Sequence, residues 1–150
     1  MANRKLLPTR LLSEEGAICR TEAEMISLGE EVGRLLGLGD VVSLEGPLGA
    51  GKTQFSKGLA AGLESRAEVS SPTFALVHEY DGGRVPVAHF DFYRLESADE
   101  LLTTGYDDNV AEGVTIVEWG NKFPEVLPAS ALRFVFEVVD PSTRVVRLVS

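Results

Sequence analysis

A glycine-rich octapeptide runs from Gly46 to Thr53 and satisfies the pattern G-x-x-x-x-G-K-[ST]. The apolar run at residues 41–45 before it predicts a strand, and Phe55, Leu59 and Leu63 share one side of a predicted helix after it. A glycine-rich turn between a strand and a helix is the setting in which this pattern holds phosphate. The segment therefore predicts an α/β fold with a phosphate-binding loop.

The residue types of this loop suit the chemistry of nucleotide binding. Glycines allow backbone conformations closed to other residues, so successive N–H groups can point at phosphate oxygens at the start of a helix. Lys52 would neutralise the β and γ phosphates, and Thr53 would offer its hydroxyl to Mg²⁺, which prefers oxygen ligands. The loop thus predicts binding of a nucleoside triphosphate together with magnesium.

The rest of the chain alternates helix-like and strand-like segments. Thr21 and Glu24 have the spacing of a capping box, so a helix is expected to begin there and to stop at Gly37 and Gly39. A further helical stretch is expected at residues 97–102. The other apolar runs predict strands, with turn signals at 81–84 and 140–143, and they cover residues 74–80, 85–90, 114–118, 132–139 and 144–149.

The length of 150 residues fits one compact domain. The turn at 81–84 makes the strands on either side of it an antiparallel hairpin. The predicted fold class is therefore α/β, a single P-loop NTPase domain over residues 1–150 whose mixed parallel and antiparallel sheet is flanked by helices. Residues 1–17 are expected to be a flexible or loosely packed N-terminal segment.

Charge and composition narrow the function classes. Asp and Glu number 23 against 14 Lys and Arg, so the net charge of −9 disfavours autonomous binding to nucleic acid. Cys19 is the only cysteine, which excludes an intrachain disulfide, and no Cys/His spacing suggests a zinc site. We expect no signal peptide, and no apolar run approaches the ~20 residues that span a bilayer, so the expected compartment is the cytoplasm.

Two acidic residues end apolar runs and are candidates for the magnesium site. A P-loop nucleotidase needs a carboxylate at the end of another strand, close to Thr53. Asp91 follows the run at 87–90, and Glu118 follows the more uniformly apolar run at 114–117. The sequence leaves open which of the two contacts the ion directly.

Two histidines and the single tryptophan are further candidates for a role near these acids. His78 and His89 have no third ligand at metal spacing, so both are expected to be strand residues satisfied by local hydrogen bonds. Trp119 directly follows Glu118 and fits either a core anchor or a contact surface. Both interpretations of Trp119 stay open from the sequence.

Several segments together resemble the bacterial TsaE family of P-loop ATPases, which serve threonylcarbamoyladenosine modification of tRNA. The resemblance covers residues 21–149. The P-loop alone is generic, whereas a Ser-Pro-Thr segment, a His-Phe-Asp-x-Tyr-Arg segment and a Glu-Trp pair in this order are specific. The segments that carry it are Leu48 to Thr53, Ser70 to Phe74, His89 to Leu95 and Val117 to Trp119.

The resemblance implies slow ATP hydrolysis, chiefly in complex with the TsaB and TsaD proteins, with tRNA met only indirectly through that complex. Lys52, Asp91 and Glu118 would be the catalytic residues. Thr53 and Glu118 look like magnesium ligands, and Asp91 looks like the Walker B-type acid. Thr53, Glu118 and Asp91 are therefore assigned to the metal site.

The resemblance also implies nucleotide and partner contacts. Ser71, Pro72 and Thr73 look like a nucleotide-sensing switch, and Trp119 would matter for function or partner contact. Two departures from the family are Pro47, where a short polar residue is usual, and Gly120, where proline is common. Nucleotide contacts are expected from Thr21, Gly49, Ala50, Gly51, Lys52, Thr53, Gln54 and Arg144.

Three other functions are compatible with a phosphate loop and have weaker support. A GTPase lacks support because the segment at 91–94 has no glycine of a D-x-x-G switch and the segment at 121–124 has no aspartate of N-K-x-D. A small-molecule kinase could use the loop and Asp91 as phosphate cradle and base, although no arginine-rich lid is visible. The third is a nucleotide-gated assembly module that does not hydrolyse ATP.

Overall fold

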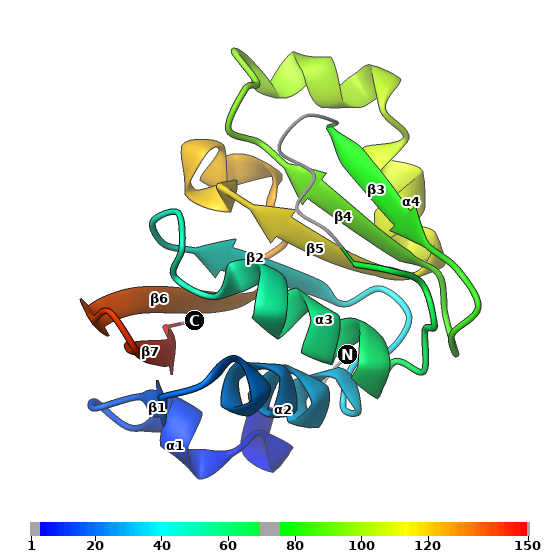
Figure 1. Ribbon diagram of the computed structural model, residues 1–150. Coiled ribbons are helices and arrows are strands. Elements are labelled where there is room, and N and C mark those ends of the chain that lie inside the picture. Colours follow the sequence, from blue (N-terminus) through cyan, green and yellow to red (C-terminus); the bar gives the residue numbers. More distant parts are fainter. Residues whose placement is uncertain (1–3, 70–75, 150) are drawn as a thin grey trace.

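The computed structural model describes residues 4–69 and 76–149, and within them seven strands form one mixed sheet (Figure 1). The strands are β1 (Ala17–Cys19), β2 (Val41–Glu45), β3 (Val77–Tyr80), β4 (Val87–Asp91), β5 (Val114–Glu118), β6 (Leu132–Asp140) and β7 (Thr143–Leu148). Their order across the sheet is β1-β7-β6-β2-β5-β4-β3. The central pairs β6–β2, β2–β5 and β5–β4 are parallel, and the outer pairs are antiparallel.

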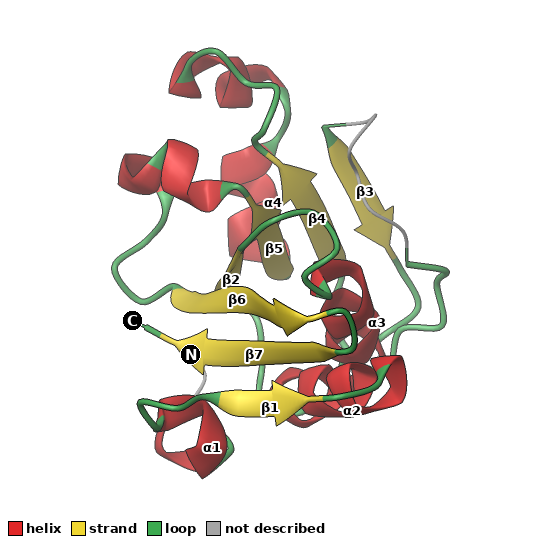
Figure 2. Cartoon of the chain, turned by 60° about the vertical axis from the view of Figure 1, so that its left-hand side comes forward, coloured by secondary structure: helices red, strands yellow, loops and turns green. Residues whose placement is uncertain are grey.

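Helices cover both faces of the sheet (Figures 1 and 2). The pair α2 (Glu22–Gly33) and α3 (Lys52–Gly62) packs its apolar side on one face, together with Leu44, Ile116 and Phe134 of the strands. α4 (Tyr106–Glu112) packs on the other face against Phe90 and Val117. The remaining short helices are α1 (Thr9–Leu12) and 3₁₀ turns at Arg4–Leu6, Ala98–Thr103, Gly120–Lys122 and Pro124–Val126.

The mixed sheet flanked by helices confirms the predicted fold class. The helix predicted at residues 52–63 and the strand at 114–118 are present within a residue of their expected bounds, and β3 pairs with β4 as an antiparallel hairpin. The stretch at 97–102 is a 3₁₀ helix over Ala98–Thr103. The strand predicted to begin at residue 74 is described from Val77, and residues 74 and 75 lie outside the described part.

The start of α2 follows the predicted cap with one difference. The Thr21 hydroxyl oxygen accepts a hydrogen bond from the Glu24 N–H at 3.0 Å, as a capping box requires. The Glu24 carboxylate accepts from the Arg20 N–H at 2.9 Å, one residue before the expected donor. The helix ends at Gly33, earlier than the predicted stop at Gly37.

The N-terminal segment is packed where the structure describes it. Leu7 and Leu11 are buried in the same core cluster as α2 and α3, and Arg4 donates to the Ala131 carbonyl at 3.0 Å. The expectation of a flexible or loosely packed segment over residues 1–17 does not fit these contacts. The chain turns at Pro8 into α1, and this short helix brings Leu11 into the core.

Helices α2 and α3 touch through glycines. A Cβ at Gly58 of α3 would lie 2.0 Å from the Ile26 carbonyl oxygen, and one at Gly29 of α2 would lie 2.2 Å from the Phe55 carbonyl oxygen. Gly33 and Gly62 repeat the pattern one turn further on. The close contact fixes α3, and with it the phosphate loop at its start, against α2.

Among the described helices, none has the length and apolar character to cross a membrane.

Candidate functional site

The loop between β2 and α3 has the backbone form that the glycine pattern predicts. Gly49 and Gly51 have φ angles of 80° and 100°, in the left-handed region that favours glycine. A Cβ at Gly46 would lie 2.8 Å from the Phe136 carbonyl oxygen of β6. The first N–H groups of α3 follow directly, and such groups have no partners within the helix. The loop can therefore present backbone N–H groups to an anion.

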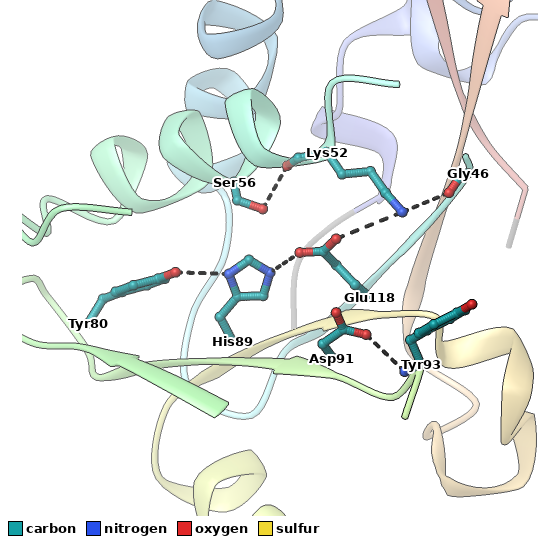
Figure 3. A network of polar contacts seen from close by, with 8 residues as sticks. All are labelled: Gly46, Lys52, Ser56, Tyr80, His89, Asp91, Tyr93 and Glu118. Atoms are coloured by element: carbon teal, nitrogen blue, oxygen red, sulfur yellow. Dashed lines mark hydrogen bonds and ion pairs between the residues drawn. The ribbon is translucent and has the colours of Figure 1, made fainter. Parts of the chain in front are cut away.

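The ammonium of Lys52 lies at the centre of the site (Figure 3). Its Nζ donates to the Gly46 carbonyl at 2.7 Å and lies 3.8 Å from Glu118 Oε1. The same nitrogen lies 5.0 Å from the centre of the Trp119 ring. Burial lowers the pKa of Lys52, and the carboxylates of Glu118 and Asp91 act in the opposite direction. The cation is therefore shielded from bulk water but faced by acids.

Asp91 and Glu118 are brought together by the parallel pairing of β4 and β5. They are register partners at the carboxyl ends of these strands, and Glu118 also pairs with Leu44 of β2, next to the start of the loop. Ligand sites of open α/β sheets form at these carboxyl ends. The structure therefore places both acids beside the phosphate loop, where the sequence predicted them.

Asp91 is 7% exposed, and its Oδ1 accepts from the Tyr93 N–H at 2.9 Å. Burial raises the pKa of Asp91, the Tyr93 hydrogen bond lowers it, and the neighbouring Glu118 charge raises it further. A cation placed beside Asp91 would favour its charged form. The acid is therefore held in surroundings that gain from a positive ligand.

Behind Glu118 lies a buried chain of hydrogen bonds from Tyr80 through His89 (Figure 3). The Tyr80 hydroxyl is 2.9 Å from His89 Nδ1, and His89 Nε2 is 2.7 Å from Glu118 Oε2. His89 was expected to be satisfied by local hydrogen bonds. It is satisfied, but one partner is 29 residues away on β5, so the expectation of local bonding was wrong.

Trp119 forms a wall of the site. Its φ of 61° is left-handed, which is unusual for a bulky residue. The ring lies over Lys52 and 5.0 Å from the Tyr93 ring, measured between centres. It is half-buried and packs at the edge of the second core cluster. Trp119 therefore packs on the core and also lines the pocket, and its role as a contact surface stays a prediction.

One pocket of about 870 Å³ connects these elements. Its volume lies within the roughly 300–1,000 Å³ of ordinary small-molecule sites. The side chain of Ala50 is buried in the core and does not line it. Ser71, Pro72 and Thr73 lie outside the described residues. The predicted site residues that line the pocket are Thr21, Gly49, Gly51, Lys52, Thr53, Gln54, Asp91, Glu118, Trp119 and Arg144.

Arg144 reaches the site from the hairpin of β6 and β7. Its Nε donates to the Gly49 carbonyl at 3.0 Å, and one terminal nitrogen donates to the Asp140 carbonyl at 2.8 Å. The Asp140 carboxylate in turn accepts from the Ser142 N–H at 2.9 Å, which together with the Thr143 hydroxyl lowers the pKa of Asp140. Arg144 thus ties the tip of the hairpin to the phosphate loop.

Several lining residues were not predicted. Tyr93 belongs to a quoted segment of the resemblance, but its contact with Trp119 depends on the loops after two different strands. Cys19 ends the three-residue strand β1 and Arg20 follows it, and this short strand has no recognisable sequence pattern. Burial raises the pKa of the Cys19 thiol. Pro47 and Leu48 also line the pocket and belong to the predicted phosphate loop. The other unpredicted lining residues are Glu22, Met25, Pro141 and Ser142.

Comparison with known proteins identifies similar chains. A family model described as threonylcarbamoyl adenosine biosynthesis protein TsaE matches residues 19–146. Two similar proteins carry the name tRNA threonylcarbamoyladenosine biosynthesis protein TsaE. The one from Bacillus subtilis is 46% identical over 100 residues, which cover 66% of this chain and 62% of that protein. The one from Treponema pallidum is 39% identical over 128 residues, covering 85% and 94%.

A solved structure shares the fold. The crystal structure of Bacillus subtilis YdiB superposes with a TM-score of 0.71 at 32% sequence identity, covering 87% of this chain and 80% of YdiB. The fold and the motifs thus point to the same group of proteins.

Proposed function

Because the chain belongs to the TsaE family of tRNA threonylcarbamoyladenosine biosynthesis proteins, we propose that it is the magnesium-dependent ATPase of that modification and acts with TsaB and TsaD. One observation carries the proposal. The phosphate loop, Lys52 and two carboxylates from neighbouring parallel strands surround one pocket of nucleotide size. An acidic protein of net charge −9 suits indirect contact with tRNA, through basic surfaces of its partners. Its place is then the cytoplasm.

In this proposal the loop, Lys52, Arg144 and the two aromatic residues have different roles. Backbone N–H groups of the loop and the start of α3 bind the phosphates, and Lys52 balances the charge on the β and γ groups. Arg144 holds the Gly49 carbonyl and so keeps the loop in shape. Trp119 and Tyr93 line the pocket beside Lys52 and contact each other through their rings.

Magnesium fits the donors of this site. Thr53, Asp91 and Glu118 offer only oxygen ligands, and Mg²⁺ is commonly bound by one or two carboxylates together with substrate phosphates and water. In the described residues, no group of three or more His, Cys, Asp or Glu side chains could hold a metal ion by itself. The ion would supply charge neutralisation at the phosphates, while Asp91 and Glu118 orient it and the attacking water.

Calorimetric titration of the full chain with ATP and Mg²⁺ tests the binding step. Lys52→Ala should weaken binding about 10- to 100-fold, since a hydrogen bond to a charged group contributes roughly 1.5–3 kcal/mol. Lys57→Ala is the matched control, because Lys57 lies on the same helix but is exposed and outside the pocket. Equal binding by the Lys52→Ala variant and the native chain would overturn the proposal.

An ATPase assay with and without TsaB and TsaD tests the function. We expect slow hydrolysis by the chain alone, a higher rate with both partners, and loss of hydrolysis in Glu118→Gln. Phosphate transfer from ATP to a nucleoside or small acid by the chain alone would favour a kinase instead. Complex formation and tRNA modification that both persist in Glu118→Gln would favour a nucleotide-gated module without hydrolysis.

A further inference from the structure

The buried pair Tyr80 and His89 lies outside the pocket but is bonded to one of its acids. His89 is fully buried on β4, Tyr80 is 3% exposed on β3, and neither lines the pocket. Residues 87, 89 and 91 alternate onto the face of β4 that carries α3, so His89 lies on the same face as Asp91. From there its ring points at Glu118 of the next strand (Figure 3).

With Glu118 ionised and the imidazole neutral, the hydrogen-bonding capacity of these groups sets the direction of the chain. An ionised carboxylate only accepts, so His89 Nε2 must carry the hydrogen of the 2.7 Å contact to Glu118 Oε2. A neutral imidazole then has an accepting Nδ1, and the Tyr80 hydroxyl donates to it at 2.9 Å. The rings of Tyr80 and His89 meet edge to face at 5.9 Å, which holds the imidazole plane.

The hydrogen bond to His89 gives the two carboxylate oxygens of Glu118 different partners. Oε2 is hydrogen-bonded to the imidazole, and Oε1 is the oxygen that lies 3.8 Å from Lys52 Nζ. A glutamate side chain has several rotatable bonds, so without a fixed partner its carboxylate would occupy more than one orientation. The bond therefore decides which oxygen faces the phosphate loop.

We propose that His89 and Tyr80 are positioning residues that hold the Glu118 carboxylate with Oε1 toward the magnesium and phosphate site. The inference rests on the proposed function for what Glu118 does, and on the hydrogen-bond geometry for how it is held. His89 exchanges no proton with substrate, because its ring is buried behind the acid. Groups that orient a metal-binding carboxylate in this way typically change metal affinity about 10- to 100-fold when removed.

The test measures Mg²⁺ affinity rather than turnover. Mg²⁺ is titrated against the full chain with a fluorescent ATP analogue, and analogue binding is measured separately in EDTA. His89→Leu should weaken Mg²⁺ binding about 10- to 100-fold and leave metal-free binding unchanged. His89→Gln should lie closer to the native value, because its amide N–H can replace Nε2. Tyr80→Phe should give a smaller loss.

Tyr106→Phe is the matched control for Tyr80→Phe. Tyr106 is a buried tyrosine on the opposite face of the sheet, and its hydroxyl donates to the Val126 carbonyl at 3.3 Å. This variant should bind Mg²⁺ like the native chain. Equal Mg²⁺ affinity in Tyr80→Phe, His89→Leu and the native chain would refute the positioning role. No Mg²⁺-dependent binding by the native chain would instead overturn the proposed function, and the inference with it.

The tautomer of His89 gives a readout that needs no ligand. Nitrogen-15 NMR of the imidazole should show a hydrogen on Nε2 of His89, and an Nε2 without a hydrogen would overturn the inference. The chain has two histidines, so a His78→Gln variant assigns the signals. If His89→Leu does not fold, this spectrum and the pair Tyr80→Phe and Tyr106→Phe decide the matter.

Discussion

The glycine contact between α2 and α3 predicts a strong effect of Gly58→Ala. The Cβ of an alanine at position 58 would lie 2.0 Å from the Ile26 carbonyl oxygen, and 2.7 Å and 2.8 Å from the Glu30 nitrogen and the Gly29 Cα. All three are backbone atoms, so no side chain can rotate away. Ordinary contact begins at 3.4 Å, so the helices must separate by about 1.4 Å (3.4 − 2.0) at this point.

The cost of this separation can be set against the gain in helix propensity. Overpacking typically costs about 1–3 kcal/mol, and a backbone against backbone clash belongs at the upper end. Alanine regains about 1 kcal/mol over glycine inside a helix. The free energy of unfolding should therefore fall by about 2 kcal/mol, which for this chain length lowers Tm by about 4–8 °C.

Urea unfolding followed by circular dichroism measures this change. Gly37→Ala is the control, since no described atom lies within 4 Å of the position of its Cβ. That variant should be neutral or more stable by up to about 1 kcal/mol. Because α3 begins at Lys52, Gly58→Ala should also weaken ATP binding. A Gly58→Ala chain as stable as the native one would refute the close contact of the helices.

Two further predictions concern buried polar groups. Burial raises the pKa of Asp91, so the folded state binds its proton more tightly and the stability from this group falls as pH rises from 3.8 through the raised value. Asp91→Asn should therefore be more stable than the native chain at pH 7 and should lose Mg²⁺-dependent ATP binding. Urea unfolding at pH 7 and at acidic pH measures the change in stability. Equal or lower stability of the variant at pH 7 would contradict the prediction. The Thr115 hydroxyl is buried without a hydrogen-bond partner among the described residues. Thr115→Val should therefore raise the free energy of unfolding by about 1 kcal/mol. A loss of stability in the same urea experiment would show that the hydroxyl is hydrogen-bonded.

Much of the site could be predicted from the sequence because its chemistry is local. The loop from Gly46 to Thr53 can be recognised from its own glycines and the helix that follows. Asp91 and Glu118 could be placed because each ends a buried strand, and parallel strands end at one edge of a sheet. These elements carry their signals within a few residues, where apolar pattern and turn chemistry act.

Elements with weak local signals were missed. β1 has three residues, one of them exposed, so no alternation could be recognised. The segment of α4 is mostly polar, and only Tyr106 and Val110 join the core, which is too few for a helical pattern. The spacing of Gly29 and Gly33, and of Gly58 and Gly62, is visible in the sequence, but its meaning comes from the contact between the two helices.

The residues that hold the site's side chains in position were harder to predict than the site residues themselves. His89 could be recognised as a strand residue that needs hydrogen bonds, yet its partners follow from two different pairings. Antiparallel pairing of β3 with β4 brings Tyr80 to one side of the ring, and parallel pairing of β4 with β5 brings Glu118 to the other. A shift of either strand by one residue would turn these side chains to the opposite face. The orientation of the Glu118 carboxylate is therefore set by the register of three strands, which the sequence around Glu118 alone does not contain.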